Sequence, residues 1–203
     1  MGDHGWNLGE HSLWAKHALY NTSTQIPIVV RDPDIAGGTR VSSLIESVDL
    51  YPTLCELTGI GRPAPTTDND GSIFNLHGSS LVPLLNNRNA PWKPAVFTRF
   101  GKGDSVRTAR FAYTEFVDVK DHPVSAMLYD LKHDPDENYN IVADNPELQR
   151  ALRQLLGDTP TAKRNAWRTL VDESNDNTPW GTELNLPEIK HPTDYREILA
   201  EFQ

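Results

Sequence analysis

The sequence has a single cysteine in its 203 residues and contains no long apolar run. One cysteine, Cys55, excludes an internal disulfide framework. No segment reaches the roughly 18 consecutive apolar residues that cross a bilayer, so no membrane span is predicted. Basic residues are also scarce, with 19 Lys and Arg against 28 Asp and Glu and a formal net charge of -9. This balance argues against a nucleic-acid partner, because a protein that binds nucleic acid needs a basic surface.

The sequence also lacks a visible export signal and has few hydrophobic residues. The residues from Met1 to Trp6 have neither a charged n-region nor an apolar h-region, so no export signal is visible and the compartment stays unknown. The hydrophobic share is 37%, which is low, so part of the chain is expected to be surface or tail. The length suits one ordinary domain.

The first half of the chain alternates strand-like and helix-like patterns, as α/β proteins do. Residues 26–30 predict a buried parallel strand, and residues 41–48 predict a second strand. Asp49 is a candidate N-cap for a helix from residue 50, which Gly59 would stop. Residues 61–79 predict a surface loop, and residues 80–85 a short helix.

The second half predicts an antiparallel sheet with a packing helix. Short β-prone segments, separated by turn residues, lie at 95–99, 105–108, 111–116 and 126–130. Pro146 follows a candidate N-cap, Asn145, and begins a helix with one leucine-rich face. After about residue 172 the chain is polar. We therefore expect three parts: residues 1–93, residues 94–171, and an extended polar tail at 172–203.

Titratable side chains are concentrated in residues 3–17, which hold two carboxylates, three imidazoles and an ammonium group. Asp3 and His4, on a glycine-flanked turn, could converge on a divalent metal. Lys16 could neutralise an anion there, and His11 or His17 could act as acid or base. Each residue alone is more often an ordinary loop residue that caps or makes surface hydrogen bonds, but the cluster favours a site.

The two tryptophans of this stretch, Trp6 and Trp14, are expected to pack against the protein rather than stack on a ligand.

This stretch closely resembles the sulfatase family of the alkaline-phosphatase-like superfamily, and most nearly its iduronate-2-sulfatase-like members. The matching blocks are Asp3-His4-Gly5-Trp6, Leu8-Gly9-Glu10-His11, Trp14-Ala15-Lys16, Ile26-Pro27-Ile28, Val48-Asp49-Leu50-Tyr51-Pro52-Thr53-Leu54, Gly78-Ser79-Ser80-Leu81, Val106-Arg107-Thr108, Leu128-Tyr129-Asp130-Leu131, Asp134-Pro135-Asp136-Glu137-Asn138 and Asn140. They follow the family's order over roughly residues 1–157. The resemblance implies the C-terminal part of the sulfatase α/β fold, with a small antiparallel-sheet-plus-helix subdomain.

The resemblance also assigns roles to the residues of the cluster. Asp3 and His4 match half of a metal site that usually holds calcium, with manganese as the alternative. Lys16 matches the lysine that contacts the sulfate, and we assign it and His11 to catalysis. Lys16, His17 and Glu10 are expected to contact substrate.

Residues further along the chain are expected to have structural roles. Arg107 and Thr108 are expected to pack the small sheet. Asp134, Glu137 and Asn140 are expected to be turn and cap residues, with a metal role as the weaker alternative.

The family's nucleophile is a formylglycine made from a Cys/Ser-x-Pro-x-Arg motif, and this sequence contains no such motif. Cys55 lies on the apolar side of a predicted helix, where a buried structural residue is expected. The paired aspartates of the other half of the metal site are not found either.

We therefore expect the C-terminal part of a metal-dependent sulfatase that acts on a sulfated small molecule or glycan. It would be a truncated reading frame or one piece of a split enzyme with an N-terminal partner chain, and it would be inactive alone. An exported full protein would imply an extracytoplasmic or lysosome-like compartment. The alternatives are a phosphate or phosphonate ester hydrolase of the same superfamily and a non-catalytic interaction module.

Overall fold

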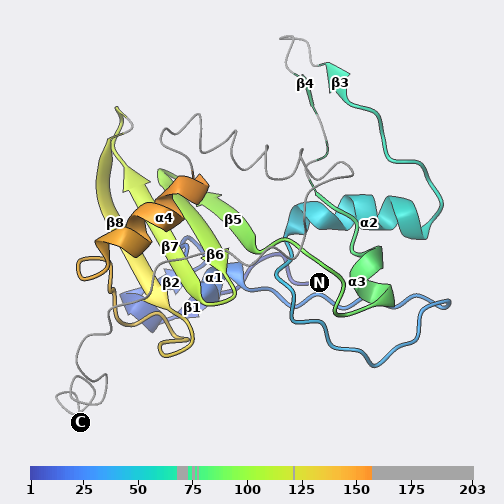
Figure 1. Ribbon diagram of the computed structural model, residues 1–203, viewed down its shortest axis with the longest axis horizontal. Helices are drawn as coiled ribbons and strands as arrows, with labels where there is room; N and C mark the ends of the chain where they lie inside the picture. Colours follow the sequence, from blue (N-terminus) through green and yellow to red (C-terminus); the bar gives the residue numbers. More distant parts are fainter. Residues whose placement is uncertain (68–72, 75, 77, 121, 157–203) are drawn as a thin grey trace.

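The computed structural model describes residues 1–67, 73, 74, 76, 78–120 and 122–156 (Figure 1). The elements in chain order are β1 (Asn7–Leu8), η1 (Glu10–Ser12), β2 (Trp14–Ala15), α1 (Asn21–Thr24), η2 (Ser47–Asp49), α2 (Leu50–Leu57), β3 (Thr66–Thr67), β4 (Ile73–Phe74), α3 (Val82–Asn86), β5 (Ala95–Phe100), β6 (Gly103–Thr108), β7 (Phe111–Val117), β8 (Pro123–Asp130) and α4 (Pro146–Leu156). A four-stranded sheet with α4 forms one lobe, and α2 and α3 lie in the other. Within these described residues, no helix is long and apolar enough to cross a membrane.

The sheet confirms the antiparallel prediction. Its strands follow the order β5-β6-β7-β8, each paired with its sequence neighbour. Val106 stands opposite Tyr113, which stands opposite Leu128, and all three side chains are fully buried. The predicted helix is α4; it begins at Pro146, because a proline at the first helical position gives up an amide that has no partner within the helix.

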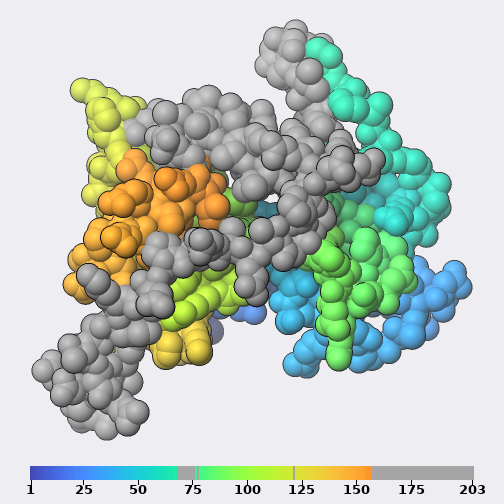
Figure 2. All heavy atoms as spheres, in the orientation of Figure 1, coloured from blue at the N-terminus to red at the C-terminus, as the bar shows by residue number. Residues whose placement is uncertain are grey.

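The two faces of the sheet have different partners. On one face lies α4, whose outer side is visible in Figure 2, and its buried leucines add to an apolar core. The core residues are Ala95, Val106, Phe111, Tyr113, Leu128, Ile141, Leu148, Leu152 and Leu156. On the other face, where β1, β2 and α1 lie, the hydroxyl of Tyr20 donates to the sulfur of Met127 at 3.3 Å. Strands β6 and β7 are therefore buried along most of their length.

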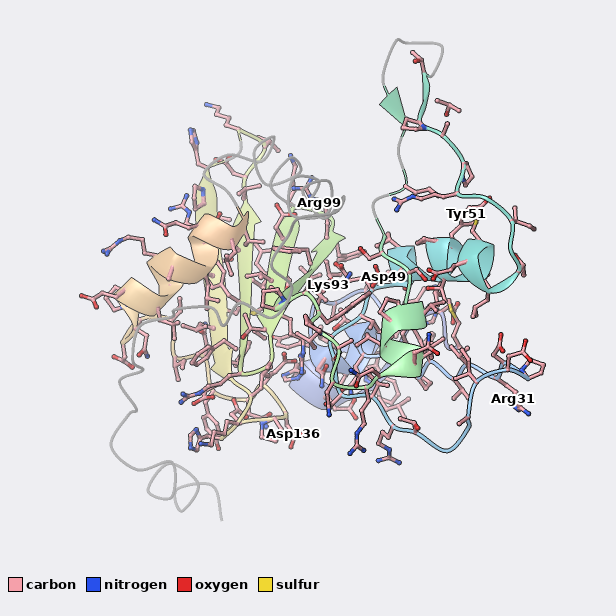
Figure 3. All side chains as sticks on the ribbon, turned by 45° about the vertical axis from the view of Figure 1, so that its right-hand side comes forward. Arg31, Asp49, Tyr51, Lys93, Arg99 and Asp136 are labelled. Carbon is pink, nitrogen blue, oxygen red and sulfur yellow. The ribbon has the colours of Figure 1, made fainter. Side chains whose placement is uncertain are left out.

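The second lobe is centred on a buried ion-pair network beside a small apolar cluster. Lys93 Nζ lies 2.7 Å from an Asp49 oxygen and 2.6 Å from a Glu46 oxygen, and these side chains are at most 10% exposed (Figure 3). Asp49 also accepts hydrogen bonds from the Ser79 and Glu46 amides. Asp49 does precede α2, as predicted, but its side chain bonds outside that helix.

The strands predicted at 26–30 and 41–48 are wrong, since residues 26–30 and 41–46 are irregular and residues 47 and 48 belong to η2. A strand needs a hydrogen-bonded neighbour, and Pro27 offers only its carbonyl, to the Gly2 amide at 3.0 Å. The loop predicted at 61–79 contains the short β3–β4 pair, and the helix predicted at 80–85 begins later, at Val82.

The remaining sequence predictions for the fold have different outcomes. Cys55 is buried, as expected. The predicted tail at 172–203 lies outside the described residues. The division at residue 93 stays a prediction.

Candidate functional site

The site is carried by a hairpin folded onto a one-turn helix. Strand β1 pairs with β2 so that Asn7 stands opposite Ala15. The hairpin reaches α1 at Gly5, whose amide donates to the Ser23 carbonyl at 2.9 Å. A Cβ atom on Gly5 would lie 1.9 Å from the Thr22 carbonyl oxygen, so only glycine permits this approach.

Asn7 joins the hairpin to α1 from within. Its side chain is fully buried and donates to the Ala15 carbonyl and to the Ser23 hydroxyl, both at 2.7 Å. The side-chain carbonyl oxygen of Asn7 accepts from the Thr22 hydroxyl at 2.5 Å. Asn7 therefore fixes the residue directly before Lys16. No sequence pattern singled out Asn7, and its position inside the titratable stretch is the one signal that could have found it.

Asp3, His4 and Lys16 come together at the end of this hairpin. His4 Nδ1 lies 2.8 Å from the Gly5 carbonyl oxygen, to which only a protonated nitrogen can donate. The Nε2 lone pair is thus free to accept from Lys16 Nζ at 2.9 Å. An Asp3 carboxylate oxygen lies 3.4 Å from the same Nε2 atom. A hydrogen bond from its own amide does most to lower the pKa of the Asp3 carboxyl, and the Lys16 ammonium acts in the same direction.

These donors suit half of a metal site. The Asp3 carboxylate is 84% exposed and ionised, and its oxygen is close enough to His4 Nε2 for both to share one cation, which would replace the Lys16 ammonium at the Nε2 lone pair. Two donors do not complete a coordination sphere. Among the residues that the structure describes, no group of three or more His, Cys, Asp or Glu could hold a metal ion.

The other predicted site residues contact different partners. Glu10 accepts from the Leu8 amide at 2.6 Å, and this bond lowers the pKa of the Glu10 carboxyl. His11 has a left-handed backbone (φ 54°) and stacks on Tyr20 with ring centroids 3.8 Å apart. His17 stacks on Phe100 at 5.4 Å.

The packing prediction for the two tryptophans is wrong. Trp6 is 53% exposed and Trp14 is 73% exposed. The alternating pattern of the hairpin explains this, because the inward position is taken by the polar side chain of Asn7 rather than by an aromatic ring. The Trp6 ring lies 5.9 Å from the His4 ring, so an exposed aromatic surface adjoins the candidate metal donors.

The turn after β8 confirms the expected turn and cap residues. Asp134 is a turn residue, since it accepts from the Asn138 and Tyr139 amides at 3.0 and 2.8 Å. Asn140 accepts from the Leu128 amide at 2.9 Å. Glu137 does not cap its own turn. It accepts from the Asn21 amide at 2.6 Å and therefore ties the turn to α1.

Two predicted sheet residues lie in β6. Thr108 closes the turn between β6 and β7 by accepting from the Phe111 amide at 2.9 Å. Arg107 packs on the sheet, as expected, and also lies 3.5 Å from a Glu137 oxygen.

The fold defines the class of protein. A solved structure titled as a complex with its substrate D-glucosamine-2-N,6-O-disulfate superposes with a TM-score of 0.66 and 26% identity, over 89% of this chain and 35% of that one. A phosphonate monoester hydrolase of Agrobacterium radiobacter shares the fold, with a TM-score of 0.63 and 24% identity over 81% of this chain and 34% of that one. The chain has the C-terminal part of the alkaline-phosphatase-like sulfatase fold.

The sequence then defines the family. The family described as "N-sulphoglucosamine sulphohydrolase, C-terminal" matches residues 9–162. Arylsulfatase K of Rattus norvegicus is 32% identical over 76% of this chain and 28% of its own length. A Delta 4,5-hexuronate-2-O-sulfatase of Bacteroides thetaiotaomicron is 30% identical over 84% of this chain and 36% of its own length. The chain belongs to the sulfatase family and spans about a third or less of these relatives.

Proposed function

We propose that this chain supplies the C-terminal part of a sulfatase active site, with Asp3 and His4 as metal ligands and Lys16 as the sulfate contact. The observation that carries the proposal is the junction at His4 Nε2, where an ammonium nitrogen at 2.9 Å and a carboxylate oxygen at 3.4 Å meet. A cation and an anionic ester group need opposite charges side by side, and this junction presents both.

We assign each residue of the site a role that follows from its charge. Asp3 and His4 would hold the divalent cation, calcium or alternatively manganese, which when bound would polarise the sulfate oxygens. Lys16 would neutralise charge on the sulfate oxygens as the S–O bond breaks. His11 would serve as the acid at the leaving oxygen, because an imidazole ring can carry and donate a proton. Glu10 and His17 would contact the rest of the substrate.

The nucleophile must come from outside this chain. No Cys/Ser-x-Pro-x-Arg motif occurs in the sequence, and the single cysteine is buried. Metal ligands and charge-neutralising groups do not replace a nucleophile. The 203-residue chain alone is therefore expected not to turn over sulfate esters, and an N-terminal chain or segment would complete it.

We propose a sulfated sugar as the substrate class. Support comes from the relatives: one is a hexuronate-2-O-sulfatase, and one similar structure carries a glucosamine disulfate. An iduronate-2-sulfatase-like specificity is the narrower form of this proposal.

The test is hydrolysis by the longest natural reading frame that contains these residues, identified by sequencing the DNA upstream of the Met1 codon. We expect release of sulfate from sulfated uronates or glucosamines. Lys16→Met and Asp3→Asn should reduce it by at least about 100-fold, the order of loss for one transition-state contact. Lys120→Met, at an exposed lysine of the β7–β8 connection, is the matched control and should leave the rate unchanged.

Two outcomes would overturn the proposal. Faster hydrolysis of phosphonate or phosphate esters would favour the other hydrolases of this fold. A frame that carries the nucleophile motif yet releases no sulfate would favour a non-catalytic interaction module.

A further inference from the structure

The turn after β8 holds a buried carboxylate that its own turn does not use. Glu137 is 3% exposed and has a left-handed backbone, with φ of 57°. Such a conformation is unfavourable for a side chain of this size, so surrounding contacts must hold it. One carboxylate oxygen accepts from the Asn21 amide at 2.6 Å, and the other lies 3.5 Å from Arg107 Nη1. Both partners lie outside the turn.

The contact with Asn21 reaches the start of α1. Asn21 is the first residue of this helix, and the preceding residue, Tyr20, makes no side-chain cap. The first amides of a helix have no partner within it. Glu137 supplies the acceptor for one of them, and a carboxylate is a stronger acceptor than a neutral oxygen. The position of Tyr20 is thus fixed through the next residue along the chain.

Tyr20 in turn supports the imidazole of His11, which stacks on its ring. The Tyr20 hydroxyl donates to Met127 of β8, and its ring lies 6.1 Å from that of Tyr129 on the same strand. The His11 imidazole stacks on Tyr20 with an interplanar angle of 6° and centroids 3.8 Å apart. The His11 ring therefore rests on a side chain whose own position depends on the sheet and on Glu137.

We infer that Glu137 is a positioning residue for His11 and acts through Asn21 and Tyr20. The small sheet thereby orients an imidazole of the N-terminal loop, although no residue of the sheet needs to touch substrate. Arg107 offsets the buried charge of Glu137. The catalytic meaning of this arrangement rests on the proposed sulfatase function, but the arrangement itself does not.

A proline substitution isolates the central hydrogen bond. Asn21→Pro removes the amide that Glu137 accepts, and proline is well tolerated at the first position of a helix. Tyr20 has φ of −74° and ψ of 158°, the extended conformation that a following proline favours. Asn21→Ala is the matched control, because both variants lose the side-chain bond to Gln25 and only the proline variant loses the amide.

The readout is the NMR shift of the His11 ring protons, which the stacked Tyr20 ring displaces upfield. We expect Asn21→Ala to keep this displacement and Asn21→Pro to lose it. Glu137→Ala should also lose it, and Glu137→Gln, which retains an acceptor oxygen, should restore it. Glu147→Gln, at an exposed residue of α4, should have no effect. A role confined to general stability would not produce rescue by glutamine.

An unchanged His11 shift in folded Asn21→Pro or folded Glu137→Ala would overturn the inference. If the Asn21→Pro variant does not fold, the comparison of Glu137→Ala with Glu137→Gln takes its place. Equal loss of the upfield His11 shift in these two variants would overturn the inference. Failure of the sulfatase proposal is separate: the shift can behave as expected while the longest reading frame releases no sulfate. Where that frame is active, Asn21→Pro should lower kcat more than it raises KM.

Discussion

The sheet with α4 and the N-terminal loop of residues 1–24 are stabilised in different ways. The sheet and α4 share a continuous apolar core in which Val106, Tyr113, Leu128 and Leu152 are fully buried. The buried residues of the loop are Asn7, Leu19 and Ser23, two of which are polar. Apolar burial is non-directional, whereas hydrogen bonds depend on geometry. Apolar burial therefore suits the sheet and α4 as a framework, whereas hydrogen bonds suit the placement of individual reactive groups in the loop.

The difference also explains the exposed apolar side chains of the loop. Trp6, Leu8 and Trp14 are all more than half exposed, yet the loop keeps a defined shape. Its shape comes from the polar contacts of Asn7 and Gly5 and from its attachment to the sheet. We therefore expect damage to the framework to unfold the molecule, and damage to the loop to release the site while the sheet persists.

The largest effect is expected at the buried ion pair. Lys93→Met removes the ammonium group that pairs with the buried carboxylates of Asp49 and Glu46. Removing one partner of a buried pair typically costs about 3–5 kcal/mol of the free energy of unfolding. Urea denaturation measures this loss, with Lys120→Met as the exposed control. A loss below about 1 kcal/mol would mean that water or other groups compensate the two carboxylates.

The next largest effect is expected in the apolar core. Leu152→Ala removes a fully buried side chain between α4 and the sheet. The free energy of unfolding should fall by about 2–5 kcal/mol, because a cavity adds to the lost burial. Arg150→Ala, on the exposed side of the same helix, should change it little. Equal effects of the two substitutions in thermal melts would contradict the assigned core.

A third substitution should separate the two regions. Gly5→Ala places a methyl group against the Thr22 carbonyl and should detach the hairpin from α1. We expect a local loss of about 1–3 kcal/mol, seen as faster amide exchange in residues 2–24 with unchanged protection in β6 and β7. Gly37→Ala meets open space and is the control. Faster exchange throughout the sheet would show that the two regions unfold together.

The smallest effect is expected from pH. Burial raises the pKa of Glu137, although the Asn21 amide and Arg107 act in the opposite direction. Between its unfolded value of 4.5 and the raised native value, the native state binds more protons than the unfolded state. The Glu137 contribution to stability is therefore complete below pH 4.5 and is lost as the pH rises through the native value.

Glu137→Gln should remove this dependence. Urea denaturation of both proteins across this pH range would show the wild type losing its relative advantage as the pH rises. Parallel profiles for the two proteins would contradict the assignment.

Sequence patterns predicted the sheet well because its signals are local. Alternating segments joined by short turns gave all four strands, and the leucine spacing with Pro146 gave α4. Residues 26–30 and 41–48 carry the same apolar signal but form no strand, because a strand also needs a neighbour. Composition alone does not report whether a neighbour is present.

The grouping of the candidate site residues was predictable from the sequence, but the contacts that hold them in place were not. The residue types at Asp3, His4 and Lys16 predicted one cluster, and the structure brings these three together. The contact between Glu137 and Asn21 spans 116 positions, and no local pattern predicts such a pairing. The polar role of Asn7 was missed for the same reason, since it depends on Ser23 and Thr22 across the fold.

The most direct test of the proposed metal site is a titration of the chain with Mn²⁺. The unpaired electrons of this ion broaden nearby NMR signals even when binding is weak. The molecule contains its own control, because Asp118 and His122 form a second Asp–His pair with the same 3.4 Å separation as Asp3 and His4. We predict that signals of Asp3, His4 and Lys16 broaden first and that Asp3→Asn abolishes the effect, whereas Asp118→Asn does not. Equal broadening at both pairs, or broadening at Asp118 alone, would contradict the assignment of Asp3 and His4 as half of a metal site.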